Sequence, residues 1–110
     1  MKKRVVGLGE VLWDLFPGRS CLGGAPANFA YITTLMGDHG MVASRVGQDS
    51  RGVEVLRRLE ELGVDIDHIQ TDREYLIGTV NVRVDSNGQP RFEISQPVAW
   101  DHLQWTPDWQ

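Results

Sequence analysis

The stretch Gly23-Gly24-Ala25-Pro26-Ala27-Asn28-Phe29-Ala30 decides the fold, because it marks the start of a helix directly after a loop. Pro26 fits the first turn of that helix, where a missing N–H costs nothing. The two glycines let the backbone approach a ligand closely, since no Cβ intervenes, and the N–H groups of a helix start point at whatever lies there. Asn28, one turn inside, carries an amide that can donate to and accept from a polyol. On glycine content alone, a plain loop-to-helix junction explains the stretch equally well.

Upstream of this junction the sequence predicts short strands. Residues 4–8 read as a buried strand that runs into glycine, the opening of an α/β unit. Residues 10–16 continue the apolar positions until Pro17-Gly18 turns the chain, and residues 19–24 can hold a second short strand. Asp14 interrupts the apolar run.

Downstream, helical and extended patterns alternate. Phe29, Ile32, Thr33 and Met36 follow the spacing of one helix face, and Gly37 stands where a glycine ends a helix. Residues 41–46 are the next strand, and Asp49 or Ser50 can cap a second helix. Residues 66–70 can form another short strand. The order of strand, helix, strand, helix and strand predicts right-handed crossovers and a parallel sheet. The apolar stripe of the second helix is Val55, Leu56, Leu59 and Leu62, before Gly63.

The pattern changes at Thr79. Residues 79–84 alternate strictly, with three valines on one face and Thr79, Asn81 and Arg83 on the other. Asn87-Gly88 is a hairpin signal, and residues 91–94 can return beside the first strand. This hairpin predicts a small antiparallel subdomain or lid. Three tryptophans follow without clear periodicity, and their size favours burial against another surface: Trp100, Trp105 and Trp109.

Composition narrows the classes of function. At 110 residues, with 41% hydrophobic and 24% charged residues, the chain is typical of one small soluble domain. A net charge of -4 offers no basic field for nucleic acid or an anionic membrane. No apolar run suits a signal peptide or a membrane span, because Gly7, Gly9 and Glu10 cut the only candidate. The single Cys21 excludes an internal disulfide, so we expect a cytoplasmic protein.

Several common sites are excluded by spacing. The third glycine of a dinucleotide-binding G-x-G-x-x-G would fall at Leu12, and no P-loop motif occurs. The three histidines, His39, His68 and His102, lack the spacing of metal ligands. We therefore expect no metal site and no cofactor-binding residue in this chain.

Five segments together resemble one family, the PfkB (ribokinase-like) carbohydrate kinases. Gly23-Gly24-Ala25-Pro26-Ala27-Asn28 is similar to the first signature of that family in its fructokinase-like form, and Glu10-Val11-Leu12-Trp13-Asp14 to its G-E-x-L-x-D segment. Val46-Gly47-Gln48-Asp49-Ser50-Arg51-Gly52 resembles V-G-x-D-x-x-G, and Leu62-Gly63-Val64-Asp65 resembles L-x-x-x-G-V-D. Residues 79–94 fall where the family has lid strands. The matches occur in the family's order and span nearly all of the chain.

The resemblance implies a fold and a sugar site. The fold is α/β and ribokinase-like, with core pieces at 1–9 and 24–77 and lid pieces at 10–23 and 78–97. Asp14 and Asn28 would hydrogen-bond sugar hydroxyls, Gly24 would close against the sugar through its backbone, and Asn81 is a weaker candidate on the lid. A lone carboxylate in an apolar strand needs partners or exposure, and an aspartate that faces water is the alternative.

The resemblance also implies what is missing. The family's second signature, a G-x-G-D anion hole with the aspartate base, does not occur in these 110 residues. We therefore expect the chain to be the amino-terminal, sugar-binding portion of an ATP- and Mg-dependent kinase, without a catalytic residue and inactive alone. Ala25 stands where ribokinases typically carry lysine, which favours a fructose-like sugar over ribose. The alternative is a non-catalytic sugar-binding or oligomerisation module, and family lids predict a homodimer.

Overall fold

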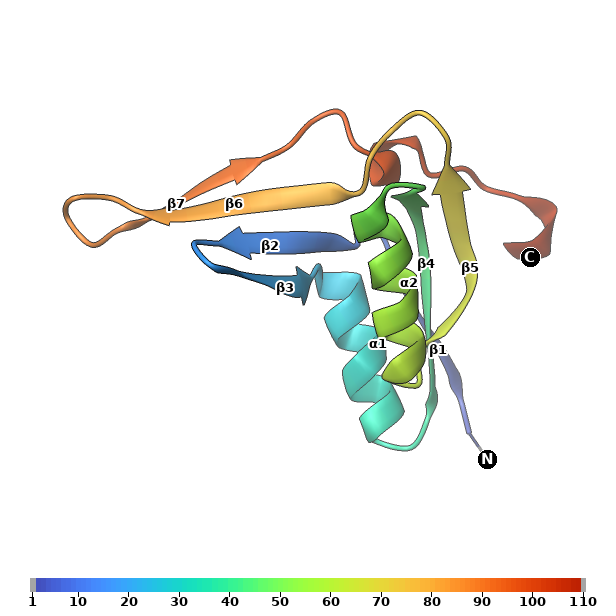
Figure 1. Ribbon diagram of the computed structural model, residues 1–110. Helices are drawn as coiled ribbons and strands as arrows, with labels where there is room; N and C mark the ends of the chain where they lie inside the picture. Colours follow the sequence, from blue (N-terminus) through green and yellow to red (C-terminus); the bar gives the residue numbers. More distant parts are fainter. Residues whose placement is uncertain (1, 110) are drawn as a thin grey trace.

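A computed structural model describes residues 2–109, which form two β-sheets and two helices (Figure 1). The first sheet is parallel and has the order β1-β4-β5. Each of its crossovers contains one helix, as the alternating sequence pattern predicts. The elements of this α/β core are β1 (Arg4–Leu8), α1 (Ala25–Leu35), β4 (His39–Gly47), α2 (Ser50–Glu61) and β5 (Asp65–Asp72).

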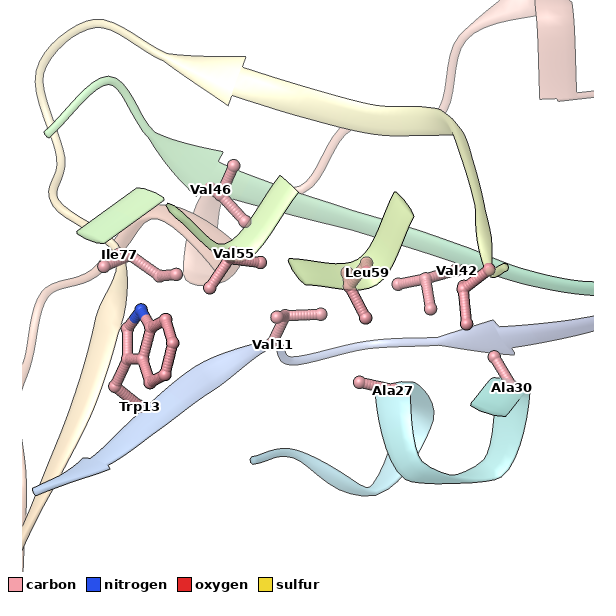
Figure 2. Close-up of a cluster of buried hydrophobic side chains, with 10 residues drawn as sticks. Val11, Trp13, Ala27, Ala30, Val42, Val46, Val55, Leu59 and Ile77 are labelled. Carbon is pink, nitrogen blue, oxygen red and sulfur yellow. The ribbon is translucent and has the colours of Figure 1, made fainter. Parts of the chain in front are cut away.

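Both helices cover the same face of this sheet (Figure 1). Val42 and Val46 of β4 point to that face and belong to one buried cluster with Ala30 of α1 and Leu59 of α2 (Figure 2). Neither helix is both long and apolar enough to cross a lipid bilayer, within the residues described. The predicted stripe of α2 is confirmed, because Val55 and Leu59 are buried and Leu56 and Leu62 pack against the cluster.

The second sheet has the order β3-β2-β6-β7 and projects from the core (Figure 1). Two antiparallel hairpins build it, the first around the predicted Pro17-Gly18 turn and the second as the alternating residues and the Asn87-Gly88 turn predict. The hairpins join through a parallel pairing of β2 with β6, which brings residues 66 positions apart into register. We call this sheet the lid. Its strands are β2 (Leu12–Phe16), β3 (Arg19–Gly23), β6 (Gly78–Val84) and β7 (Pro90–Ile94).

The buried face of α1 differs from the predicted one. Phe29, Ile32 and Met36 are more than half exposed, whereas Ala27 and Ala30 are buried. The reason lies in two glycines on the neighbouring strands. A Cβ on Gly7 would overlap the carbonyl of Pro26, and a Cβ on Gly40 would overlap that of Ala30. The helix backbone therefore sits directly on β1 and β4, where only small side chains fit.

The carboxyl-terminal segment lies against the other face of the parallel sheet. A hollow of about 510 Å³ separates Trp105 and Trp109 from Val6, Leu8 and neighbouring residues of that face. The two indole rings meet edge to face at 5.9 Å, yet Trp105 stays 68% exposed. Trp100 and Trp109 are half-buried, so none of the three tryptophans is fully buried within this chain, and their burial against another surface stays a prediction. Two short 3₁₀ helices occur here, Ala99–His102 and Pro107–Trp109.

An ion pair between Arg45 and Asp72 links the carboxyl ends of β4 and β5. Arg45 donates from Nε to Asp72 Oδ2 at 2.7 Å and from Nη1 to Gln70 at 3.2 Å. The other carboxylate oxygen of Asp72 accepts the backbone N–H groups of Tyr75 and Glu74. The Arg45 guanidinium, followed by the two backbone donors, lowers the pKa of Asp72 from 3.8 to about 2.

We expect the ion pair between Arg45 and Asp72 to contribute to unfolding in acid. Because the folded pKa of Asp72 lies below the unfolded value of 3.8, its stabilisation is full above about pH 4 and is lost as the pH falls towards 2. Asp72→Asn should therefore flatten the fall in unfolding free energy between pH 4 and pH 2, measured from urea midpoints by circular dichroism. Asp67→Asn, at an exposed position, removes the same charge and serves as the control. If the unfolding free energy of the two variants fell equally steeply between pH 4 and pH 2, the ion pair of Asp72 would not explain this part of acid unfolding.

Candidate functional site

The candidate site lies where the chain leaves the carboxyl end of β1, passes through the first lid hairpin and returns to start α1. In open α/β sheets, ligands bind outside the carboxyl ends of the strands, at the point where the order of winding changes. Here β1 is the outermost strand of the described parallel sheet, and the chain winds from it towards β4 and β5. The start of α1 and the base of the lid therefore lie at the carboxyl end of a parallel strand, β1.

Gly24 sets the geometry of the helix start. Its φ of 101° is a backbone conformation that glycine adopts readily and L residues rarely do. Its carbonyl accepts the first helical bond, from the N–H of Asn28 at 3.2 Å, and no side chain caps the helix. The N–H groups of Ala25 and Ala27 precede that first bond and have no helical acceptor. This helix start therefore offers two backbone donors and the positive end of a helix dipole.

Asp14 is brought beside this helix start by the pairing of β2 with β3. Leu12 lies opposite Gly23, so Gly23 and Asp14 occupy neighbouring positions on one face of the lid. A Cβ on Gly23 would overlap the carboxylate of Asp14, and the missing side chain therefore leaves the space that this carboxylate fills. Asp14 is half-buried, and no hydrogen bond to its carboxylate occurs among residues 2–109. As a partly exposed carboxylate, it can accept hydrogen bonds from a ligand or from water.

Asn28 is the third candidate residue at this junction, and it lies on the core side. Its side chain is exposed, one turn into α1, and its backbone is tied to Gly24. The structure thus places three of the four predicted residues, Asp14, Gly24 and Asn28, around one junction. A carboxylate, an amide and free N–H groups can together accept from and donate to neighbouring hydroxyl groups.

Asn81, the fourth candidate residue, does not lie on the same face as Asp14. In the parallel register, Asp14 lies opposite Val80, whereas Asn81 lies opposite Leu15. Because successive side chains of a strand point to opposite faces, Asn81 points away from the face that carries Asp14. The half-buried Asn81 therefore has no geometric link to the other three residues.

Gly23 has a structural role at this junction that the sequence pattern alone does not predict. It was predicted only as one of two glycines that permit close approach, whereas the structure gives it a specific neighbour in Asp14. The signal in the sequence was its position, because a glycine that ends a strand can leave room for a side chain of the paired strand.

Among the residues described, no group of three or more His, Cys, Asp or Glu side chains is arranged to hold a metal ion.

Comparison with known proteins identifies relatives with this fold and these motifs. The sequence profile described as "pfkB family carbohydrate kinase" matches residues 18–107. A fructokinase of Escherichia coli is 34% identical over 96% of this chain. A fructokinase of Klebsiella pneumoniae is 37% identical over 84% of it. The chain spans 40% and 32% of the lengths of these two relatives.

Solved structures give the same result. The apo fructokinase of Vibrio cholerae O395 superimposes with a TM-score of 0.83 at 31% identity, over 88% of this chain and 35% of that one. A fructokinase of Xylella fastidiosa with bound ATP gives 0.83 at 28% identity, over 94% of this chain and 35% of that one. The predicted α/β fold, with a parallel sheet and a lid, is therefore confirmed.

The geometry of Gly24 predicts a stability difference between two glycines. A Cβ at Gly24 would stand 2.7 Å from the carbonyl oxygen of Glu10, in addition to the strain of its φ. Gly24→Ala should lower the unfolding free energy by about 2–5 kcal/mol, from backbone strain plus overlap. Gly18→Ala is the matched control, because Gly18 also has a positive φ but open space around it. Its loss should be about 1–2 kcal/mol. Equal losses in urea denaturation would refute the close approach of Gly24 to Glu10.

Proposed function

Because the chain belongs to the pfkB family of carbohydrate kinases, we propose that it is the amino-terminal, sugar-binding part of a fructokinase-like enzyme. The observation that carries the proposal is the carboxylate of Asp14, half-buried beside an uncapped helix start and without a hydrogen-bond partner among the described residues. A sugar supplies the donors that this acceptor lacks, and it can also meet the N–H groups of the helix start.

We assign the roles of the site residues as follows. Asp14 accepts hydrogen bonds from two sugar hydroxyls, Asn28 donates to and accepts from a third group, and Gly24 lets the helix start close against the ring. Hydrogen bonds to a carboxylate are stronger than those to a neutral acceptor, and the partial burial of Asp14 limits competition from water. Asn81 stays a weaker candidate, since it points to the other face of the lid.

The reaction of the family transfers a phosphoryl group from ATP to a sugar hydroxyl. The residues of this chain do not fit the nucleotide or its metal ion, because they include neither the G-x-G-D motif nor a group of metal ligands among the described residues. ATP use is supported by the relative from Xylella fastidiosa, which was solved with bound ATP. We propose that this chain contributes sugar binding and that residues beyond it contribute the nucleotide site and the base.

We propose a fructose-like substrate and a homodimer through the lid. Both curated relatives are fructokinases, and Ala25 replaces the lysine that the resemblance associates with ribose. The lid exposes three large apolar side chains, Val84, Phe92 and Ile94, which a second lid can cover. The free Cys21 suits a reducing cytoplasm, and we propose that location.

A kinase that contains this segment should lose sugar affinity when Asp14 changes. In Asp14→Asn the amide presents one acceptor and an unwanted donor, so the sugar KM should rise at least about tenfold while the KM for ATP stays within about twofold. Asn28→Ala should act in the same direction but less, because a neutral hydrogen bond is weaker. Steady-state kinetics with both substrates varied would decide, with Asp67→Asn as the control. A sugar KM unchanged in Asp14→Asn would remove this residue from the site.

The isolated 110-residue chain should not phosphorylate sugars. Phosphoryl transfer requires the nucleotide, its metal ion and the stabilising donors in one place. A coupled ADP-release assay with fructose and MgATP on a homogeneous sample should therefore give no rate above the blank. Turnover above the blank would refute the proposed division of roles and would favour a complete site built from these residues or from two copies.

A further inference from the structure

The segment Val46-Gly47-Gln48-Asp49-Ser50-Arg51-Gly52 has a role that the sugar site does not explain. The sequence predicts Asp49 or Ser50 as the side-chain cap of α2. Asp49 is indeed the residue before the helix, with an extended backbone, but its side chain makes no capping bond. Its Oδ1 instead accepts the backbone N–H of Ile77 at 3.2 Å, 28 residues further along the chain.

Ile77 stands at the entrance to the lid. It directly precedes β6, is 2% exposed, and lies near Trp13 in the buried cluster (Figure 2). Gly47 allows this approach, because a Cβ there would overlap the Asp49 carboxylate and stand 2.8 Å from the nitrogen of Ile77. The segment that enters β6 is therefore seated directly on the turn between β4 and α2.

A second hydrogen bond links β2, the other central strand of the lid, to the first turn of α2. Trp13 of β2 is 4% exposed and donates from Nε1 to the carbonyl of Arg51 at 2.9 Å. Its register partner across the parallel pairing is Thr79 of β6. Strand β2 and the residue that directly precedes β6 thus each donate one hydrogen bond to residues 49–51, close to the point where the lid leaves the core.

We propose that Asp49 is a positioning residue for sugar binding, which acts by fixing the base of the lid on the core. Asp14 follows Trp13 directly in β2, so a shift of the lid base moves the carboxylate away from Gly24 and Asn28. The acceptor is a carboxylate, whose hydrogen bonds are stronger than those of a neutral group, and its place at the positive end of α2 stabilises its negative charge. Asp49 itself does not contact the sugar. The part of the proposal that concerns sugar rests on the proposed function.

Amide hydrogen exchange of the whole 110-residue chain tests the positioning of the lid. Asp49→Ala should accelerate exchange in residues 77–84 by about tenfold or more, because a charge-assisted bond is lost, while β4 and α2 stay protected. Asp49→Asn keeps an acceptor oxygen and should restore most of the protection. Asp65→Ala is the control, since Asp65 also accepts a backbone N–H, from Asp67, at the far end of β5. It should leave residues 77–84 unchanged.

Two exchange results would overturn the proposal. Equal acceleration in all elements of Asp49→Ala would mean that the residue only stabilises the fold, and unchanged exchange in residues 77–84 would mean that it does not hold the lid.

Calorimetric titration with D-fructose tests the link to the sugar. Asp49→Ala should weaken fructose binding at least about tenfold, and Asp49→Asn should stay within about threefold of the unchanged chain. Accelerated lid exchange with unchanged fructose affinity would overturn the link between Asp49 and the sugar. If the unchanged chain bound no fructose, the proposed sugar site would fail, whereas the exchange results would still decide whether Asp49 fixes the lid.

Discussion

The direct contact of the α1 backbone with β1 and β4 is the constraint on which the other features depend. Gly7 and Gly40 make it possible, because a side chain at either position would overlap a carbonyl group of the helix. The contact fixes the distance of the helix from the sheet and limits its inner face to small residues such as Ala27 and Ala30. It also fixes where the helix begins, so that Gly24 lies beside the chain that leaves β1 for the lid.

The same contact explains the apolar surface of α1. Large side chains that cannot fit beneath α1 point outward, and across the sheet Val6 and Leu8 of β1 are more than half exposed. Between these surfaces runs the free edge of β1, which pairs only with β4 among the described strands. The chain spans 35% of the Vibrio cholerae fructokinase. The exposed large apolar residues of α1 and of its carboxyl cap are Phe29, Ile32, Leu35 and Met36.

The sequence predicted those features that depend on neighbours along the chain. The strands, the stripe of α2 and the lid hairpins follow from local periodicity and turn residues. The inner face of α1 could not be predicted in this way, because glycines on two other strands determine it. Likewise, the alternation at 79–84 separates Asn81 from the valines, but the register with β2 decides which face carries Asp14. Asp49 has the identity of a helix cap, and only the tertiary structure supplies Ile77 as its partner.

The site belongs to neither part of the molecule alone. Asp14 lies on a lid strand, whereas Gly24 and Asn28 lie on the core, so the three meet only while the base of the lid is docked. The docking depends on buried Trp13 and Ile77 and on few polar contacts, of which two are the bonds to residues 49–51. A ligand that contacts both lid and core binds more tightly when the base of the lid is docked on the core. By thermodynamic linkage, its binding stabilises the docked arrangement by the same free energy.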